Sequence, residues 1–90
     1  MRVGTIVQNL GAGLETYFVY TGEKPYGGKG RVSSLTKGYG ITRHGKEWAF
    51  RKDCYAIDDL EDHERFPRVG YIDIEQVLTR DILRAIGKDE

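Results

Sequence analysis

The sequence predicts a small, mainly β protein (α+β): an SH3-like or related antiparallel barrel, or a curved sheet of five or six strands, with one C-terminal α-helix. Runs of β-branched and aromatic residues recur at short intervals, as they do in small all-β domains. Glycine-rich or two-residue turn signals separate these runs. An amphipathic segment with helical spacing follows them.

The 90 residues fit one domain spanning 1–90, and 39% hydrophobic with 31% charged residues is an ordinary composition for such a domain. No apolar run reaches membrane-spanning length, and the N-terminus shows no signal peptide. Cys54 is the only cysteine, which excludes an internal disulfide framework and suits a reducing compartment. We therefore expect a cytoplasmic protein without a membrane partner.

The first two strands are predicted at residues 2–9 and 14–21, on either side of a turn-rich segment. The second strand is rich in aromatic and β-branched residues. Its side chains alternate between two faces, with Leu14, Thr16, Phe18 and Tyr20 on one and Tyr17 and Val19 on the other. Because both faces are apolar, we expect this strand to be central in the sheet.

The middle of the chain is predicted to form short strands joined by tight turns. The strands are expected at 31–36, 39–43 and 46–51, with an extension at 54–57. They are separated by a glycine-rich loop at 22–30, by turns at Lys37–Gly38 and His44–Gly45, and by a bend at Lys52–Asp53. Gly45 suits the positive φ of a two-residue hairpin turn.

The C-terminal helix is predicted to run from Asp73 to Ile86. Asp73 is a good N-cap, and Gln76 stands at the capping-box position three residues later. Gly87 falls where a left-handed C-terminal cap is expected. One broad face is apolar and contains Ile74, Val77, Leu78, Ile82, Ala85 and Ile86. Leu83 lies outside that face, either as an isolated exposed leucine or as a contact to a second subunit.

The formal net charge of zero conceals a division between two halves. Residues 1–52 carry nine Lys/Arg and three Asp/Glu, which gives +6, whereas residues 53–90 carry five and eleven, which gives −6. The halves either pair within the fold or between subunits, or they form surfaces for a partner. We expect a homo-oligomer, with oligomer or partner contacts at Leu83, Asp59, Asp62 and Glu64.

Basic and aromatic residues are interleaved between positions 24 and 52. Cations suit phosphates and exposed rings suit bases, so this composition is typical of a nucleotide or nucleic-acid site. The alternative is an ordinary solvated sheet face; Trp48 and Phe50 in particular have the same-face spacing of core residues. We expect ligand contacts from Lys24, Tyr26, Lys29, Arg31, Tyr39, Arg43 and Arg51.

One stretch carries a resemblance to a known motif. It reads Val19-x-x-Gly22-x-Lys24, then Gly28-Lys29-Gly30-Arg31-Val32-x-x-Leu35, with Ile41 further on. This stretch resembles the KOW motif of ribosomal and transcription-factor barrels, with an additional Pro25-Tyr26-Gly27 segment. The resemblance implies a nucleic-acid-binding module.

The whole chain is also similar to small accessory proteins of bacteriophages and prophages. The similarity lies in the Val-Gly-Thr-Ile-Val start, the Tyr-rich second strand, and Phe66-Pro67-x-Val69-Gly70 before a short terminal helix. It implies an anti-defence protein that acts by binding, either by occupying a host protein or by sequestering a nucleotide signal.

No catalytic or cofactor motif is recognisable, and we expect neither a cofactor nor a metal. The loop at 22–30 is not a P-loop, because Gly28 stands where lysine is required. His63 and Glu64, beside neighbouring acids, leave a small hydrolase or nuclease as an alternative. The leading hypothesis is a non-catalytic binding protein whose partner is a phosphate-bearing small molecule or a host protein.

Overall fold

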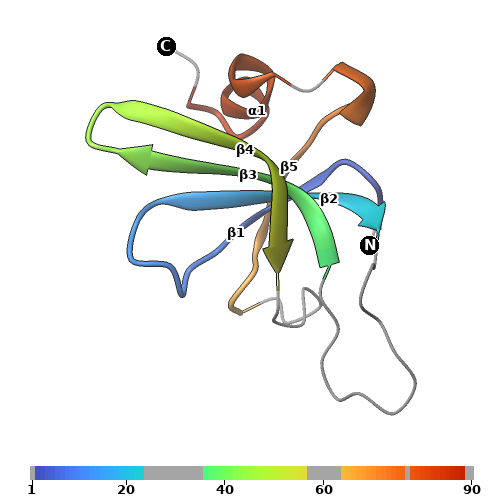
Figure 1. Cartoon of the computed structure of the whole chain (residues 1–90), viewed down its shortest axis with the longest axis horizontal. Coiled ribbons are helices and arrows are strands. Elements are labelled where there is room, and N and C mark those ends of the chain that lie inside the picture. The colour runs from blue at the N-terminus through green and yellow to red at the C-terminus, as the bar shows by residue number, and fades with distance from the viewer. Residues whose placement is uncertain (1, 24–35, 57–63, 77, 89–90) are drawn as a thin grey trace.

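The computed structural model describes residues 2–23, 36–56, 64–76 and 78–88 (Figure 1). Five antiparallel strands form one curved sheet in the order β4-β3-β2-β1-β5. The strands are β1 (Thr5–Gln8), β2 (Thr16–Glu23), β3 (Thr36–His44), β4 (Glu47–Ala56) and β5 (Arg68–Tyr71). A 3₁₀ turn, η1 (Ile74–Gln76), and a helix, α1 (Thr79–Ala85), follow. The mainly β class with a curved sheet and a C-terminal helix is confirmed.

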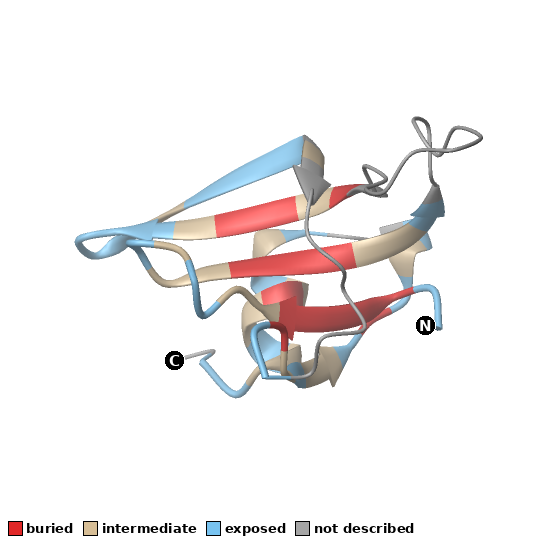
Figure 2. Cartoon of the chain, turned by 90° about the horizontal axis from the view of Figure 1, so that it is seen from below, coloured by how far each residue is buried: buried red, intermediate tan, exposed pale blue. Residues whose placement is uncertain are grey.

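β2 is the central strand of the sheet, as its two apolar faces predict. On one face, Tyr17 and Val19 belong to a buried cluster that α1 completes with Ile82. On the other face, Phe18 packs with Val7 and Phe66. Figure 2 shows that the buried positions follow the middle of the sheet. The described residues therefore form two small cores, one on each side of a shared strand.

β3 is a single strand from Thr36 to His44, so the predicted turn at Lys37–Gly38 is wrong. Gly38 pairs with Tyr20 on one side and Cys54 on the other. A Cβ atom at Gly38 would lie 2.2 Å from the carbonyl oxygen of Val19. This glycine thus allows a close approach of two strands rather than a turn. The predicted strand 31–36 lies outside the described residues except for Thr36, and the predicted loop 22–30 except for Gly22 and Glu23.

The β3–β4 hairpin turns at Gly45–Lys46, one residue later than predicted. His44 and Glu47 face each other across the ladder, and Gly45 has a φ of 64°. Glycine at the first loop position is the requirement of one of the two favoured hairpin turns. Further along, the register shifts opposite Tyr39, so that Lys52–Asp53 form a β-bulge. The bulge lies at the predicted bend.

β5 is a strand that the sequence did not predict. Its four residues pair with β1 and place Gly70 opposite Ile6. A Cβ atom at Gly70 would lie 2.7 Å from the carbonyl oxygen of Ala85 in α1. The run is short and contains glycine, so its strand propensity is weak, and pairing with β1 supplies the structure.

The predicted continuous helix is wrong, because two pieces replace it. Asp73 does cap, since its Oδ1 accepts a hydrogen bond of 3.0 Å from the Glu75 amide, but it caps only the 3₁₀ turn. Leu78 is extended, with φ −126° and ψ 155°, and α1 begins after it without a side-chain cap. Ile74 and Ile82 thereby pack on the same core cluster. Tertiary burial has outweighed the local helical pattern.

The break changes which leucine is covered. Leu78, predicted on the apolar face, is 66% exposed. Leu83, predicted outside that face, is half-buried and packs against the α1-side cluster. The predicted C-terminal cap is confirmed: Gly87 has a φ of 79°, and the Lys88 amide donates to the Leu83 carbonyl oxygen at 2.8 Å.

We expect Ile82→Ala to lower the free energy of unfolding by about 2–5 kcal/mol, because it removes a fully buried side chain and leaves a cavity. Leu78→Ala is the matched control and should change stability by less than about 0.5 kcal/mol, since most of this side chain is exposed. Urea unfolding followed by circular dichroism measures both variants. Equal losses would contradict the observed orientation of α1.

A second substitution tests the close approach at Gly38. Gly38→Ala should cost about 2 kcal/mol or more, because the new methyl group meets the Val19 carbonyl and the Phe18 ring. Gly13→Ala is the control, since nothing lies within 4 Å of a Cβ atom there. The midpoints of thermal unfolding report the difference. If both variants melt together, the strands are not held as closely as the structure shows.

Candidate ligand-binding surface

Four aromatic rings gather on the α1 side of β2, β3 and β4, and we call them the ring surface: Tyr17, Tyr39, Trp48 and Phe50. The centroids of Tyr17 and Trp48 are 6.0 Å apart with a 43° interplanar angle. Those of Tyr39 and Phe50 are 5.9 Å apart at 42°. Both separations are typical of favourable aromatic pairs. The buried Ile41 lies between Tyr17 and Phe50 in the cross-strand row.

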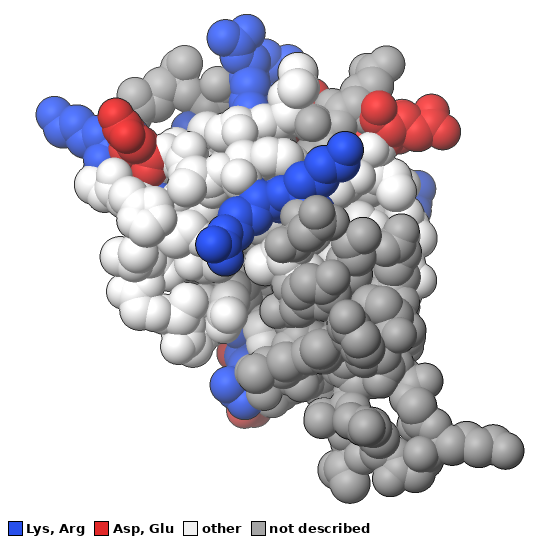
Figure 3. Space-filling view, viewed as in Figure 1, with Lys and Arg blue, Asp and Glu red and all other residues white. Residues whose placement is uncertain are grey.

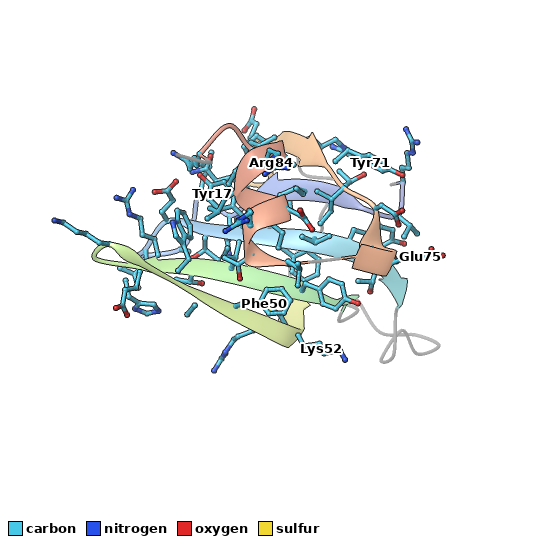
Figure 4. All side chains as sticks on the ribbon, turned by 90° about the horizontal axis from the view of Figure 1, so that it is seen from above. Tyr17, Phe50, Lys52, Tyr71, Glu75 and Arg84 are labelled. Atoms are coloured by element: carbon cyan, nitrogen blue, oxygen red, sulfur yellow. The ribbon has the colours of Figure 1, made fainter. Side chains whose placement is uncertain are left out.

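The rings differ in exposure because α1 covers only part of this face. α1 packs close to Gly70 of β5, at the far edge of the sheet from β4. Tyr17 is 2% exposed, Tyr39 and Trp48 are half-buried, and Phe50 is 37% exposed. Figure 4 looks onto this side and shows Phe50 between α1 and the β4 edge. The accessible part of the ring surface therefore follows the β3–β4 hairpin.

Two cations flank the accessible rings. Arg43 and Lys52 lie near them, whereas Arg51 and Glu47 of the same segment lie on the opposite face of the sheet. The Arg43 guanidinium carbon lies 5.7 Å from the Trp48 centroid, within cation–π distance. Lys52 is exposed and lies beyond Phe50 on β4 (Figure 4). Figure 3, which has the orientation of Figure 1 and therefore shows another side of the molecule than Figure 4, shows an uncharged area crossed by one long basic side chain. The composition suits a flat, anionic ligand.

A carboxylate fixes one end of this surface. Glu15 Oε2 accepts a hydrogen bond of 2.5 Å from the Tyr17 hydroxyl and lies 3.0 Å from Lys88 Nζ. Its other oxygen, Oε1, lies 3.4 Å from Arg43 Nη1. The backbone adds a contact, because the Arg43 amide donates to the Glu15 carbonyl oxygen at 2.9 Å. Glu15 thus joins β2, β3 and Lys88, which lies three residues after the end of α1.

This arrangement shifts two pKa values in opposite directions. The hydrogen bond from Tyr17, and then the contacts with Lys88 and Arg43, hold the pKa of Glu15 below its usual value, although burial opposes them. Burial first, and then the hydrogen bond to Glu15, raise the pKa of the Tyr17 hydroxyl. Glu15 is therefore a carboxylate at neutral pH and Tyr17 a neutral donor. The pair has a structural function and offers no group that titrates near neutrality.

The sequence-predicted ligand residues fall into three groups. Lys24, Tyr26, Lys29 and Arg31 lie outside the described residues. Tyr39 and Arg43 share the ring-surface side of β3, because their cross-strand partners Val19 and Trp48 belong to that side. Arg51 is exposed on the opposite face, since it pairs with Gly40 one position away from Phe50. The structure thus brings two of the predicted residues together and separates the third from them.

Sequence reasoning placed Trp48 and Phe50 in the core, and only part of that holds. Trp48 is half-buried and packs against the core cluster, whereas Phe50 is partly exposed beside Tyr39. The sequence did not lead us to predict that Glu15 connects several elements. Its position two residues before Tyr17 indicated a contact between them, because residues two apart in a strand share a face.

Two of the four predicted partner residues, Asp59 and Asp62, lie outside the described residues, as does His63 of the hydrolase alternative. Of the other two, Glu64 is exposed, and Leu83 packs against the α1-side cluster. In the part of the chain that the structure describes, no cluster of three or more His, Cys, Asp or Glu side chains could hold a metal ion. Among those same residues, neither helical segment has the length and apolar run needed to cross a bilayer.

The Glu15 cluster makes a prediction about pH. Glu15→Gln should lower the free energy of unfolding at pH 7 by about 1 kcal/mol, because the neutral amide cannot form ion pairs with Lys88 and Arg43 and accepts a weaker hydrogen bond from Tyr17. Glu15 has a lower pKa folded than unfolded, so its stabilisation is complete above the usual value of 4.5 and disappears as the pH falls through the lowered pKa. The variant and the native chain should therefore converge in strong acid.

Urea titrations at pH 7 and in strong acid measure this difference. Glu75→Gln is the matched control, since Glu75 is exposed on η1, away from the Glu15 cluster. A loss that persists undiminished in acid would show that charge is not the cause.

No protein-family model matches the chain, and neither the curated proteins nor the solved structures contain a significant match. The geometry of the ring surface is therefore the basis for a functional argument.

Proposed function

We propose that the chain is a non-catalytic binding protein whose ring surface receives the planar base of a nucleotide unit while nearby cations contact the phosphate. The observation that carries this proposal is the pairing of the partly exposed Phe50 with Tyr39, next to Arg43 over Trp48. Bases stack on exposed rings regardless of sequence, and arginine and lysine neutralise phosphates.

The rings are held in position before a ligand arrives. Tyr39 and Trp48 are half-buried against the core, and Phe50 packs on Tyr39. A base that stacks here would therefore immobilise few side chains, which keeps the entropy cost of binding low. Stacking on such a ring is worth about 1–3 kcal/mol per base, judged by alanine substitution.

The phosphate would join an existing charge network. Arg43 already lies near Glu15, and both side chains are accessible, at 46% and 24% exposed respectively. A phosphate that approaches Arg43 along the hairpin would be the second anion in contact with the guanidinium, after Glu15. The Arg43 side chain would stay accessible to solvent. Lys46 and Lys52 are exposed nearby and increase the local positive charge. The attraction should weaken as salt concentration rises.

The nucleotide unit has two natural sources. A free nucleotide agrees with the accessory-protein resemblance, in which binding would sequester a signal. A single strand of nucleic acid agrees with the KOW-like stretch and with the use of open sheet faces by other small β domains. The two sources differ in salt dependence, because only a strand releases several counterions on binding.

Fluorescence of Trp48, the only tryptophan, provides the test. We expect quenching on titration with adenosine monophosphate or with a mixed-sequence single-stranded DNA oligonucleotide, and the oligonucleotide affinity alone should fall steeply with salt. Phe50→Ala should weaken binding by roughly tenfold or more, in line with the loss of one stacking ring.

Tyr71→Ala is the control for this substitution. Tyr71 is also an exposed ring under a cation, with the Arg2 guanidinium carbon 4.0 Å from its centroid, but it lies on β5, away from the ring surface. An equal effect of both substitutions, or no quenching by either probe, would refute the proposal.

A further inference from the structure

β4 is the long edge strand of the sheet. Among the described residues it pairs only with β3, and five of the six residues from Glu47 to Lys52 are exposed, with Trp48 half-buried. Figures 1 and 2 both show the β3–β4 hairpin projecting from the body of the molecule. An open edge with unpaired backbone groups is a template for another strand.

The backbone geometry defines which groups point outward. His44 and Glu47 flank a two-residue loop, where facing residues exchange hydrogen bonds, and bonded pairs alternate along an antiparallel ladder. Glu47, Ala49 and Arg51 therefore direct their backbone groups toward β3. Trp48 and Phe50 direct theirs toward the open edge. Any antiparallel partner must bond to these two residues.

The side chains of this edge are self-complementary. The segment reads Glu47-Trp48-Ala49-Phe50-Arg51, so reversing it exchanges an acid with a base and one aromatic residue with another. We propose that β4 pairs antiparallel with β4 of a second copy of this chain, with the two-fold axis at Ala49. Glu47 then faces Arg51 of the partner subunit, and Trp48 faces the partner's Phe50.

This register satisfies the backbone and the side chains together. Trp48 and the partner's Phe50 are both outward-directed, so they form a hydrogen-bonded pair on each side of the axis. Opposite charges and aromatic pairs across an antiparallel ladder are stabilising. The β-bulge at Lys52–Asp53 ends the regular edge immediately after the pairing segment.

The neighbouring registers lack this match. A shift that places Phe50 opposite itself separates Glu47 from Arg51 of the partner subunit and extends the pairing into the β-bulge at Lys52–Asp53. The reverse shift, with Trp48 opposite itself, sets Glu47 against the partner's Ala49 and leaves it without a charged neighbour across the ladder. Opposite charges across a ladder stabilise it, and both shifts lose the pair of Glu47 with Arg51 of the partner subunit. The self-complementary register is thus the favoured one among those that satisfy the outward backbone groups.

Pairing at β4 would place the two ring surfaces side by side on the same face of a continuous sheet. The inference itself does not depend on any ligand, because it concerns the backbone edge of β4 and the side-chain pairs across it. Its test therefore contains no nucleotide, and its failure would leave the proposed function untouched.

Cysteine cross-linking tests the axis. In the proposed register Ala49 faces itself in a non-bonded pair with Cα atoms about 4.5 Å apart, a separation that a disulfide spans. Ala49→Cys, in a Cys54→Ala background, should form a disulfide-linked dimer under mild oxidation. Lys46→Cys in the same background is the control, since it is exposed on the same hairpin and does not face itself. Equal or faster cross-linking of the control would overturn the proposal.

Charge reversal tests the register without cysteine chemistry. Glu47→Arg and Arg51→Glu should each raise the dimer dissociation constant by about tenfold or more, because each places two like pairs across the interface. The double reversal should restore dimerisation, which a mere loss of folding would not. Sedimentation velocity measures the three variants and the native chain. A monomeric native chain at every accessible concentration, or a double variant no better than the single ones, would overturn the proposal.

Discussion

Both faces of β2 are apolar, and a chain of ninety residues has little material with which to cover them. One face receives a helix of seven residues and the other receives Phe66 from the segment before β5. The helix reaches across β5, β1 and β2 but does not cover the outer rings on β4. The partial exposure of Phe50 is thus a consequence of limited coverage, and the same limit leaves open the ring surface for which we propose a ligand.

The Glu15 cluster compensates for the shortness of the helix. α1 begins without a side-chain cap and has few turns to hold it against the sheet. Lys88, directly after the C-terminal cap, reaches Glu15 at the start of β2, and Tyr17 anchors that carboxylate from inside the core. The terminal segment is therefore attached at the capped end by charge and at Ile82 by burial. This division of roles explains why neither a strong N-cap nor a long helix is present.

Local sequence patterns predicted the structural features that depend on residues close together in the sequence. The alternation in β2, the left-handed cap at Gly87 and the bend at Lys52–Asp53 are of this kind. Gly38 was misread as a turn because a lone glycine signals either a turn or a close approach, and only the packed neighbour distinguishes them. The break at Leu78 and the coverage of Leu83 depend on how α1 meets the sheet. For the proposed site, residue type alone suggested Tyr39 and Arg43. The exposure of Phe50 could not be predicted in this way, because it depends on how far α1 extends over the sheet.

The two edge strands of the sheet differ, because β5 is short and β4 contains a bulge. Both features limit how copies of the chain can assemble through these edges. β5 has four residues, and the regular part of β4 stops at its bulge. A long, flat, uninterrupted edge at both sides would allow molecule after molecule to join head to tail into an open polymer. Here each edge is too short or too distorted for that growth. An open sheet of this size thus remains compatible with a finite, closed assembly.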